Sequence, residues 1–160
     1  MIASPAGVRA TVLLATVAWA AGEALMRRSP AVDHSARAVW TIGLALMILH
    51  VVLAFEVVYA WNHAAAVAAT ARQTAAVVGR GWEAGIFVNY VFIAVWAADV
   101  CWWWTAPASR ASRSRRLETA RFAFFVFMFV NGAIVFASGV GRVVGVVAVA
   151  GALATGMRRR

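Results

Sequence analysis

Ionisable and amide side chains stand inside long apolar stretches of this sequence. These residues are Glu23, His50, Glu56, Asn89, Asp99 and Asn131. On insertion scales a charged side chain at the centre of a bilayer costs about 2.5–3.5 kcal/mol, and lipid offers an amide no hydrogen-bond partner. Side chains of this kind therefore face the interior of a helix bundle, where they bind solutes, relay protons or fasten helices together.

A first group of these residues is expected at similar depth, towards the outer half of the membrane. The group contains Glu56, Asn89, Asn131 and His50, which come from three different apolar runs. We expect them to line a polar cavity that binds a small polar or cationic solute or relays protons. Glu56 would carry the charge, and Arg142 in an outer turn could neutralise it.

A second group, Glu23 and Asp99, is expected at an inner level, where Arg27 or Arg110 could pair with the two acids. The alternative for both groups is a purely structural role. Hydrogen bonds and ion pairs between membrane helices are worth roughly 0.6–2 kcal/mol each, which would hold the bundle together without any site.

Helical spacing supports the convergence of these side chains. In residues 84–104, steps of four, three, four and three predict one stripe facing the bundle: Gly85, Asn89, Phe92, Trp96 and Asp99. Ile86 and Val91 would then face lipid. In the preceding apolar run, Glu56, Tyr59 and His63 share one helix face.

The elements that must position these residues are transmembrane helices. Hydrophobic residues make up 64% of the 160-residue chain and charged residues 13%, against roughly 45–50% and 25% in soluble domains. Apolar runs cover residues 8–26, 39–61, 84–104, 122–137 and 143–157. We predict an all-α, polytopic bundle forming a single integral membrane domain. It has five spans, or four if the last apolar stretch is a single helix.

Helix lengths decide how the apolar runs are divided. Residues 122–157 as one helix would extend about 54 Å, whereas a hydrocarbon core is roughly 30 Å thick. Residues 138–142, with two glycines and an arginine, are therefore predicted to form a turn. The second run continues without Gly or Pro through Ala76, which predicts a helix that projects beyond the membrane.

Tryptophans give a second measure of span length, because indole rings favour the membrane interface. Trp40 and Trp61 are separated by about 31 Å of ideal helix, and so are Trp82 and Trp103. Each separation matches one bilayer thickness, so all four rings are expected at interfaces.

The net charge of +9 comes from arginines that stand between or after the apolar runs. This position favours cytoplasmic loops facing anionic lipid, not nucleic acid binding. It predicts a multi-pass protein of the cell membrane with an outer N-terminus and a cytoplasmic C-terminus. The first run also resembles a cleaved signal peptide, but cleavage would leave Arg27, Arg28 and Arg37 outside and reverse the charge bias.

Cofactor and enzyme chemistry receive little support from the sequence. The chain has no lysine for a Schiff base, and its single cysteine, Cys101, is expected to be a small buried residue. His50 and His63 leave haem or quinone binding open as an alternative, with bis-histidine haem ligation requiring a second chain. Glu56 and His63 lack a third metal ligand. Nucleophile elbows, phosphate loops and HExxH motifs do not occur, which favours a non-enzymatic role.

The last apolar run carries a small-residue face. Gly141 and Gly145 form a GxxxG pattern, which Ala148 and Ala152 extend. Such a face packs closely against another helix of the same chain or of a second copy. A further alternative is therefore a non-catalytic accessory subunit that joins a homo-oligomer or a larger membrane complex through Gly141 and Gly145.

Overall fold

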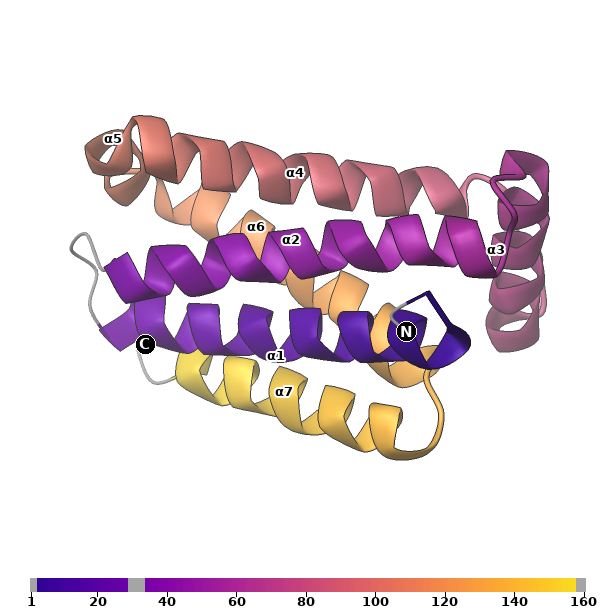
Figure 1. Ribbon diagram of the computed structural model, residues 1–160. Coiled ribbons are helices and arrows are strands. Elements are labelled where there is room, and N and C mark those ends of the chain that lie inside the picture. The colour runs from indigo at the N-terminus through magenta and orange to yellow at the C-terminus, as the bar shows by residue number, and fades with distance from the viewer. Residues whose placement is uncertain (1–2, 29–33, 158–160) are drawn as a thin grey trace.

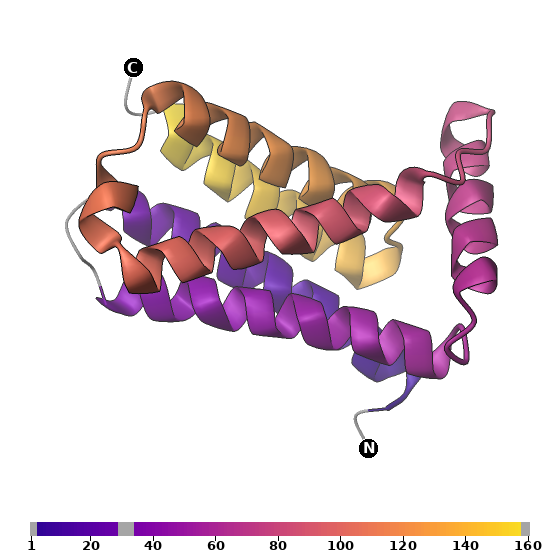
Figure 2. The ribbon, with the colours of Figure 1, turned by 90° about the horizontal axis from the view of Figure 1, so that it is seen from above.

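A computed structural model describes residues 3–28 and 34–157, in which the regular secondary structure is entirely helical. The elements are α1 (Pro5–Arg28), α2 (His34–Val57), α3 (His63–Val78), α4 (Gly85–Thr105), α5 (Pro107–Ala111), α6 (Arg115–Val130), a π-helical turn η1 (Asn131–Val135) and α7 (Gly139–Met157). The long helices run side by side, whereas α3 lies across one end of the bundle (Figures 1 and 2). The all-α prediction is confirmed.

Four helices are long and apolar enough to cross a membrane. They cover Pro5–Arg27, His34–Val57, Gly85–Thr105 and Arg115–Val135. The chain is therefore a multi-pass membrane protein by length and composition. The predicted break in the last apolar stretch is present, because α7 begins at Gly139, whose φ is +56°. The predicted fifth span, residues 143–157, lies within α7, whose apolar part Gly139–Thr155 is shorter than the other four, and it stays a prediction.

The second apolar run does not continue as one projecting helix, so that prediction is wrong. α2 ends at Val57, and Ala60 and Trp61 turn the chain with φ values of +47° and +58°. The Asn62 side chain then caps α3 by accepting a hydrogen bond of 3.1 Å from the amide of Ala65. Two non-glycine residues in the left-handed region leave no plain sequence signal. The sequence signal for this break is Asn62, because asparagine commonly caps the N-terminus of a helix.

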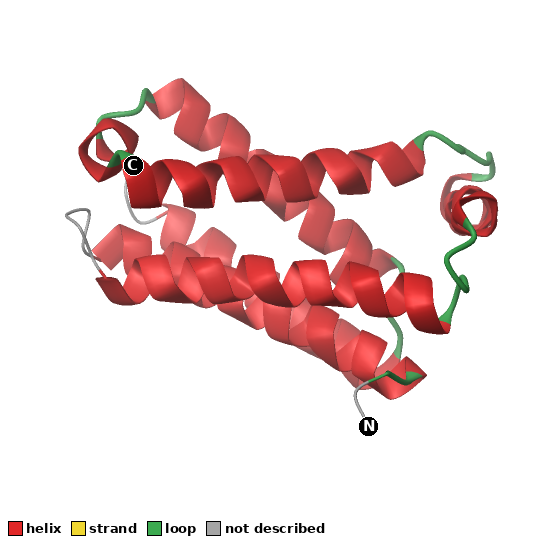
Figure 3. Cartoon of the chain, turned by 45° about the horizontal axis from the view of Figure 1, so that its top comes forward, coloured by secondary structure: helices red, strands yellow, loops and turns green. Residues whose placement is uncertain are grey.

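Different helices and loops lie at the two ends of the bundle (Figure 3). The end of α1, the start of α2, α5 and the start of α6 lie together at one end, which we call the arginine-rich end. The helix α3 lies at the other, which we call the opposite end. This placement follows from the alternating directions of successive helices.

The core is a cluster of aromatic rings. Trp19 stacks on Phe129 with 4.5 Å between centroids, and Trp40 lies 5.2 Å from both Trp96 and Phe125. Gly43 permits this packing, since a β-carbon there would come within 2.8 Å of the Trp96 ring.

Two of the four tryptophans expected at interfaces are buried among the helices. Trp40 is 0% exposed and Trp103 is 6% exposed, whereas Trp61 and Trp82 are exposed. The position of the four rings at membrane interfaces stays a prediction. The buried rings are covered by arginines, because the guanidinium of Arg110 lies 3.7 Å from the ring centre of Trp103 and that of Arg121 lies 4.9 Å from Trp40.

Candidate functional site

The acids predicted at the inner level are buried and paired. Glu23 is 1% exposed and Asp99 is 6% exposed. Arg27 lies 3.4 Å from Glu23, and Arg110 donates two hydrogen bonds to Asp99, of 2.7 and 3.1 Å. Both pairings expected from the sequence are therefore present.

Three further residues, missed in the sequence, join these pairs into one system. Arg121 donates to Glu23 at 2.6 Å and to Glu118 at 2.7 Å. Arg113 donates to Asp99 at 2.6 Å and also pairs with Glu118. The result is a continuous charge network made of Glu23, Arg27, Asp99, Arg110, Arg113, Glu118 and Arg121. The available signal was Glu118 three residues before Arg121 on a helix that enters the membrane.

The charge network joins elements far apart in the sequence. Glu23 belongs to α1, Asp99 to α4 and Arg121 to α6, so the network ties three long helices at the arginine-rich end. Aromatic faces surround it, since the Arg27 guanidinium lies 4.5 Å from the ring centre of Phe122. Charges in such surroundings interact more strongly than charges in water.

Arg110 lies in α5, between two candidate spans, and its charge is opposed and supported at once. Burial lowers the pKa of the Arg110 guanidinium below its ordinary value, while Asp99 raises it. An arginine keeps its proton in proteins even when its pKa falls, so Arg110 remains a cation. The Asp99 site therefore contains two fixed positive charges, from Arg110 and Arg113.

The residues predicted for the outer site form local contacts. Glu56 is exposed and accepts a 2.6 Å hydrogen bond from the indole nitrogen of Trp61. The ring nitrogen Nδ1 of His50 lies 2.9 Å from the carbonyl oxygen of Val8, which fixes the ring between α1 and α2. Asn131, the first residue of η1, donates to the carbonyl of Phe127 in the preceding turn of α6 at 2.7 Å.

Asn89 and Arg142 differ most from expectation. Phe92, Trp96 and Asp99 are buried as the helical stripe predicted, but Asn89 is exposed, and Ile86, expected to face lipid, is buried. The first turns of α4 pack against α3, which changes the buried face there; a β-carbon on Gly85 would lie 3.1 Å from Thr70 of α3.

Arg142 donates to the carbonyl of Ala137 at 2.9 and 2.7 Å, so its expected pairing with Glu56 is absent. Across residues 3–28 and 34–157, no hydrogen bond or ion pair joins any two of Glu56, Asn89, Asn131 and His50. Their convergence on one cavity stays a prediction.

Tyr59 and His63 belong to an aromatic group at the opposite end. Tyr59 lies in the turn after α2 and His63 begins α3, so the expected shared helix face with Glu56 does not form. The His63 ring lies 6.0 Å from Tyr90 and 6.5 Å from Phe55. These rings join α2, α3 and α4 at the opposite end.

The small-residue face of α7 packs within the chain. A β-carbon on Gly145 would overlap the carbonyl oxygen of Ala133, and one on Gly141 would lie 3.6 Å from Leu13. The close-packing surface proposed for a second copy is thus occupied by η1 and α1. Among the described residues, no three His, Cys, Asp or Glu side chains are placed to hold a metal ion. Cys101 is exposed on α4, not buried as expected.

The comparisons with known proteins add no relative. No family model, no curated protein and no solved structure matches this chain. The geometry of the charge network and its surroundings is therefore the basis for any functional argument.

Proposed function

We propose that this protein moves protons or a small polar solute through the bundle, with the charge network as a closed gate at the arginine-rich end. The observation that carries the proposal is the charge network itself, which is buried and continuous across three helices. Buried ion pairs contribute little net stability compared with apolar side chains of the same size. Ionisable residues inside a membrane more commonly mark a pathway for ions or solutes.

Unpartnered donors in the core support the same function. The indole N–H groups of Trp19, Trp40 and Trp96 are buried and find no acceptor within the described part of the chain. A buried donor without an acceptor costs about 1–3 kcal/mol. Water or a polar solute entering the bundle would supply that acceptor, and Trp40 lies directly beneath Arg121 of the charge network.

The opposite end would supply the entrance. Glu56 is exposed there and hydrogen-bonded to Trp61, so its carboxylate is accessible to a proton or to a small cation. This assignment keeps Glu56 as the charge-carrying group, with Asn89 exposed on the neighbouring α4. His50 and Asn131, which come from α2 and η1, remain proposed lining residues.

The test is flux across liposomes that contain the purified protein. A pH-sensitive dye inside the vesicles reports proton movement, and we expect faster equilibration than in protein-free vesicles. Trp96→Phe removes one buried N–H and retains a large ring, so it should reduce flux about tenfold. It should change thermal stability little, because the void left by the smaller ring and the removal of an unpaired donor act in opposite directions.

A matched control is Trp104→Phe, because Trp104 is exposed and its indole already donates to Thr41 at 3.0 Å. It should leave flux unchanged. Glu56→Gln should abolish flux without changing the unfolding temperature. Flux by the unmodified protein that equals that of empty vesicles, both for protons and for a panel of small cations and neutral solutes, would remove the proposal. If the charge network only holds the helices together, substitutions in it will change stability, and the protein will show no flux.

A further inference from the structure

The arginines of α5, of the turn after it and of α6 divide into two sets. Arg110, Arg113 and Arg121 turn inward and pair with acids of the charge network. Arg115 and Arg116 are exposed, and neither forms an ion pair with any residue that the structure describes. Because every acid nearby already has arginine partners, these two guanidinium groups are available to an anion from outside the chain.

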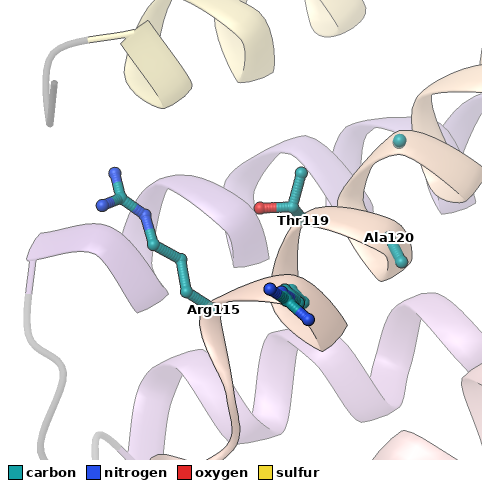
Figure 4. Close-up of a pocket in the computed structure, with 5 residues that line it drawn as sticks. Arg115, Thr119 and Ala120 are labelled. Carbon is teal, nitrogen blue, oxygen red and sulfur yellow. The ribbon is translucent and has the colours of Figure 1, made fainter.

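Arg115 and Arg116 line an open pocket of about 630 Å³ on the surface of α6. The other lining residues are Thr119, Ala120 and Ala123, so the floor consists of small side chains. Figure 4 shows the Arg115 and Thr119 side chains extending from the same side of the helix, one turn apart. The pocket thus has a cationic mouth beside a hydroxyl group and an apolar floor.

The pocket lies at the start of a candidate membrane span. Arg115 and Arg116 are the first two residues of the candidate span Arg115–Val135, and Ala120 and Ala123 lie one to two turns deeper. Ser114 caps the helix by accepting a 3.3 Å hydrogen bond from the amide of Leu117, and the positive end of the helix dipole points to the same place. Polarity therefore decreases along the pocket in the direction of the bilayer core.

We propose that this pocket binds an anionic phospholipid. Arg115 and Arg116 contact its phosphate, Thr119 donates a hydrogen bond to a headgroup oxygen, and an acyl chain lies over Ala120 and Ala123. Arginine suits this role because its planar group donates paired hydrogen bonds to phosphate oxygens. A free phosphate ion would use only the mouth of the pocket and leave the alanine floor without a ligand.

Native mass spectrometry of the full-length protein tests the assignment. The protein in mild detergent is mixed with phosphatidylglycerol or with phosphatidylcholine, and bound lipid is counted. We expect phosphatidylglycerol to bind more tightly than phosphatidylcholine. The double variant Arg115→Gln with Arg116→Gln should lose about tenfold or more of that affinity, since each basic residue near anionic lipid contributes substantially.

The chain offers a matched control in Arg72 and Arg80, which are exposed near the opposite end. Arg72→Gln with Arg80→Gln removes the same charge and should leave the lipid affinity within about twofold. Equal losses of lipid affinity in the two double variants would show that overall charge causes the effect, and would overturn the proposed lipid site. Unchanged binding by the Arg115 and Arg116 variant would do the same.

Inorganic phosphate separates the lipid from a free anion. We expect millimolar phosphate to displace little phosphatidylglycerol, because the acyl chain contributes to binding. Complete displacement would assign the pocket to a soluble anion and overturn the lipid. Circular dichroism of each variant should match the unmodified protein, since Arg115 and Arg116 form no internal pair.

Discussion

The two ends of the bundle satisfy their polar side chains in different ways. At the arginine-rich end, buried charges from α1, α4 and α6 pair with one another across long sequence separations, as between Glu23 and Arg121. At the opposite end, polar side chains bind nearby backbone or sequence neighbours, as Arg142 binds the carbonyl of Ala137. Long-range ion pairs tie three helices together at the first end, whereas the second is held by local hydrogen bonds, by aromatic rings and by the contact of His50 with the carbonyl of Val8.

This difference determines what each end can do. Opening a buried ion-pair network part-way is costly, because separating one partner leaves another buried charge without compensation. Groups that bind their own helix can be exposed or rearranged at low cost. The gate that we propose would therefore lie at the arginine-rich end, and the proposed entrance at the end that contains Glu56.

The largest expected effect comes from breaking the charge network. Arg121→Met leaves Glu23 and Glu118 without their shared partner, so the protein should lose about 3–5 kcal/mol of stability. The measurement is thermal unfolding in detergent followed by tryptophan fluorescence. Adding Glu23→Gln to Arg121→Met should restore part of the loss, because one uncompensated charge disappears.

Arg142→Met is the control for the opposite end, since Arg142 is exposed and binds only a backbone carbonyl. Its effect should stay within about 0.5 kcal/mol, the usual range for surface positions. A loss as small for Arg121→Met as for Arg142→Met would show that the two ends do not differ in this respect.

A smaller effect is expected where backbone packing, and not charge, holds the half of α7 that is nearer the opposite end. Gly145→Ala would place a methyl group against the carbonyl of Ala133 and should cost about 1–3 kcal/mol. Gly141→Ala meets Leu13 at an ordinary 3.6 Å and should be neutral or stabilising, because alanine favours helix. Unfolding temperatures of the two variants give the comparison, and a neutral Gly145→Ala would contradict the close packing.

The sequence predicted the helices, the burial of Glu23 and Asp99 and one arginine partner for each, but not the exposure of Glu56 or the further partners Arg121 and Arg113. Apolar length sets the spans, and burial of Glu23 and Asp99 follows from the cost of charge in lipid. Arg121 stands just before the apolar run of residues 122–137, and helical periodicity does not reveal which other helix its side chain reaches. Asn89 was misplaced because the stripe assumed one packing partner for α4, whereas α3 packs against its first turns.

The smallest effect compares one helix cap from each end. Asn62→Ala removes the side-chain cap of α3, and Ser114→Ala removes that of α6, each at about 1 kcal/mol of local stability. Hydrogen exchange should rise more in the first turn of α3, because the ring contacts of His63, and no ion pair among the described residues, hold that turn to other helices. The first turns of α6 are also held by Glu118 and Arg121 of the charge network. Equal increases in both helices would mean that the charge network does not stabilise the start of α6.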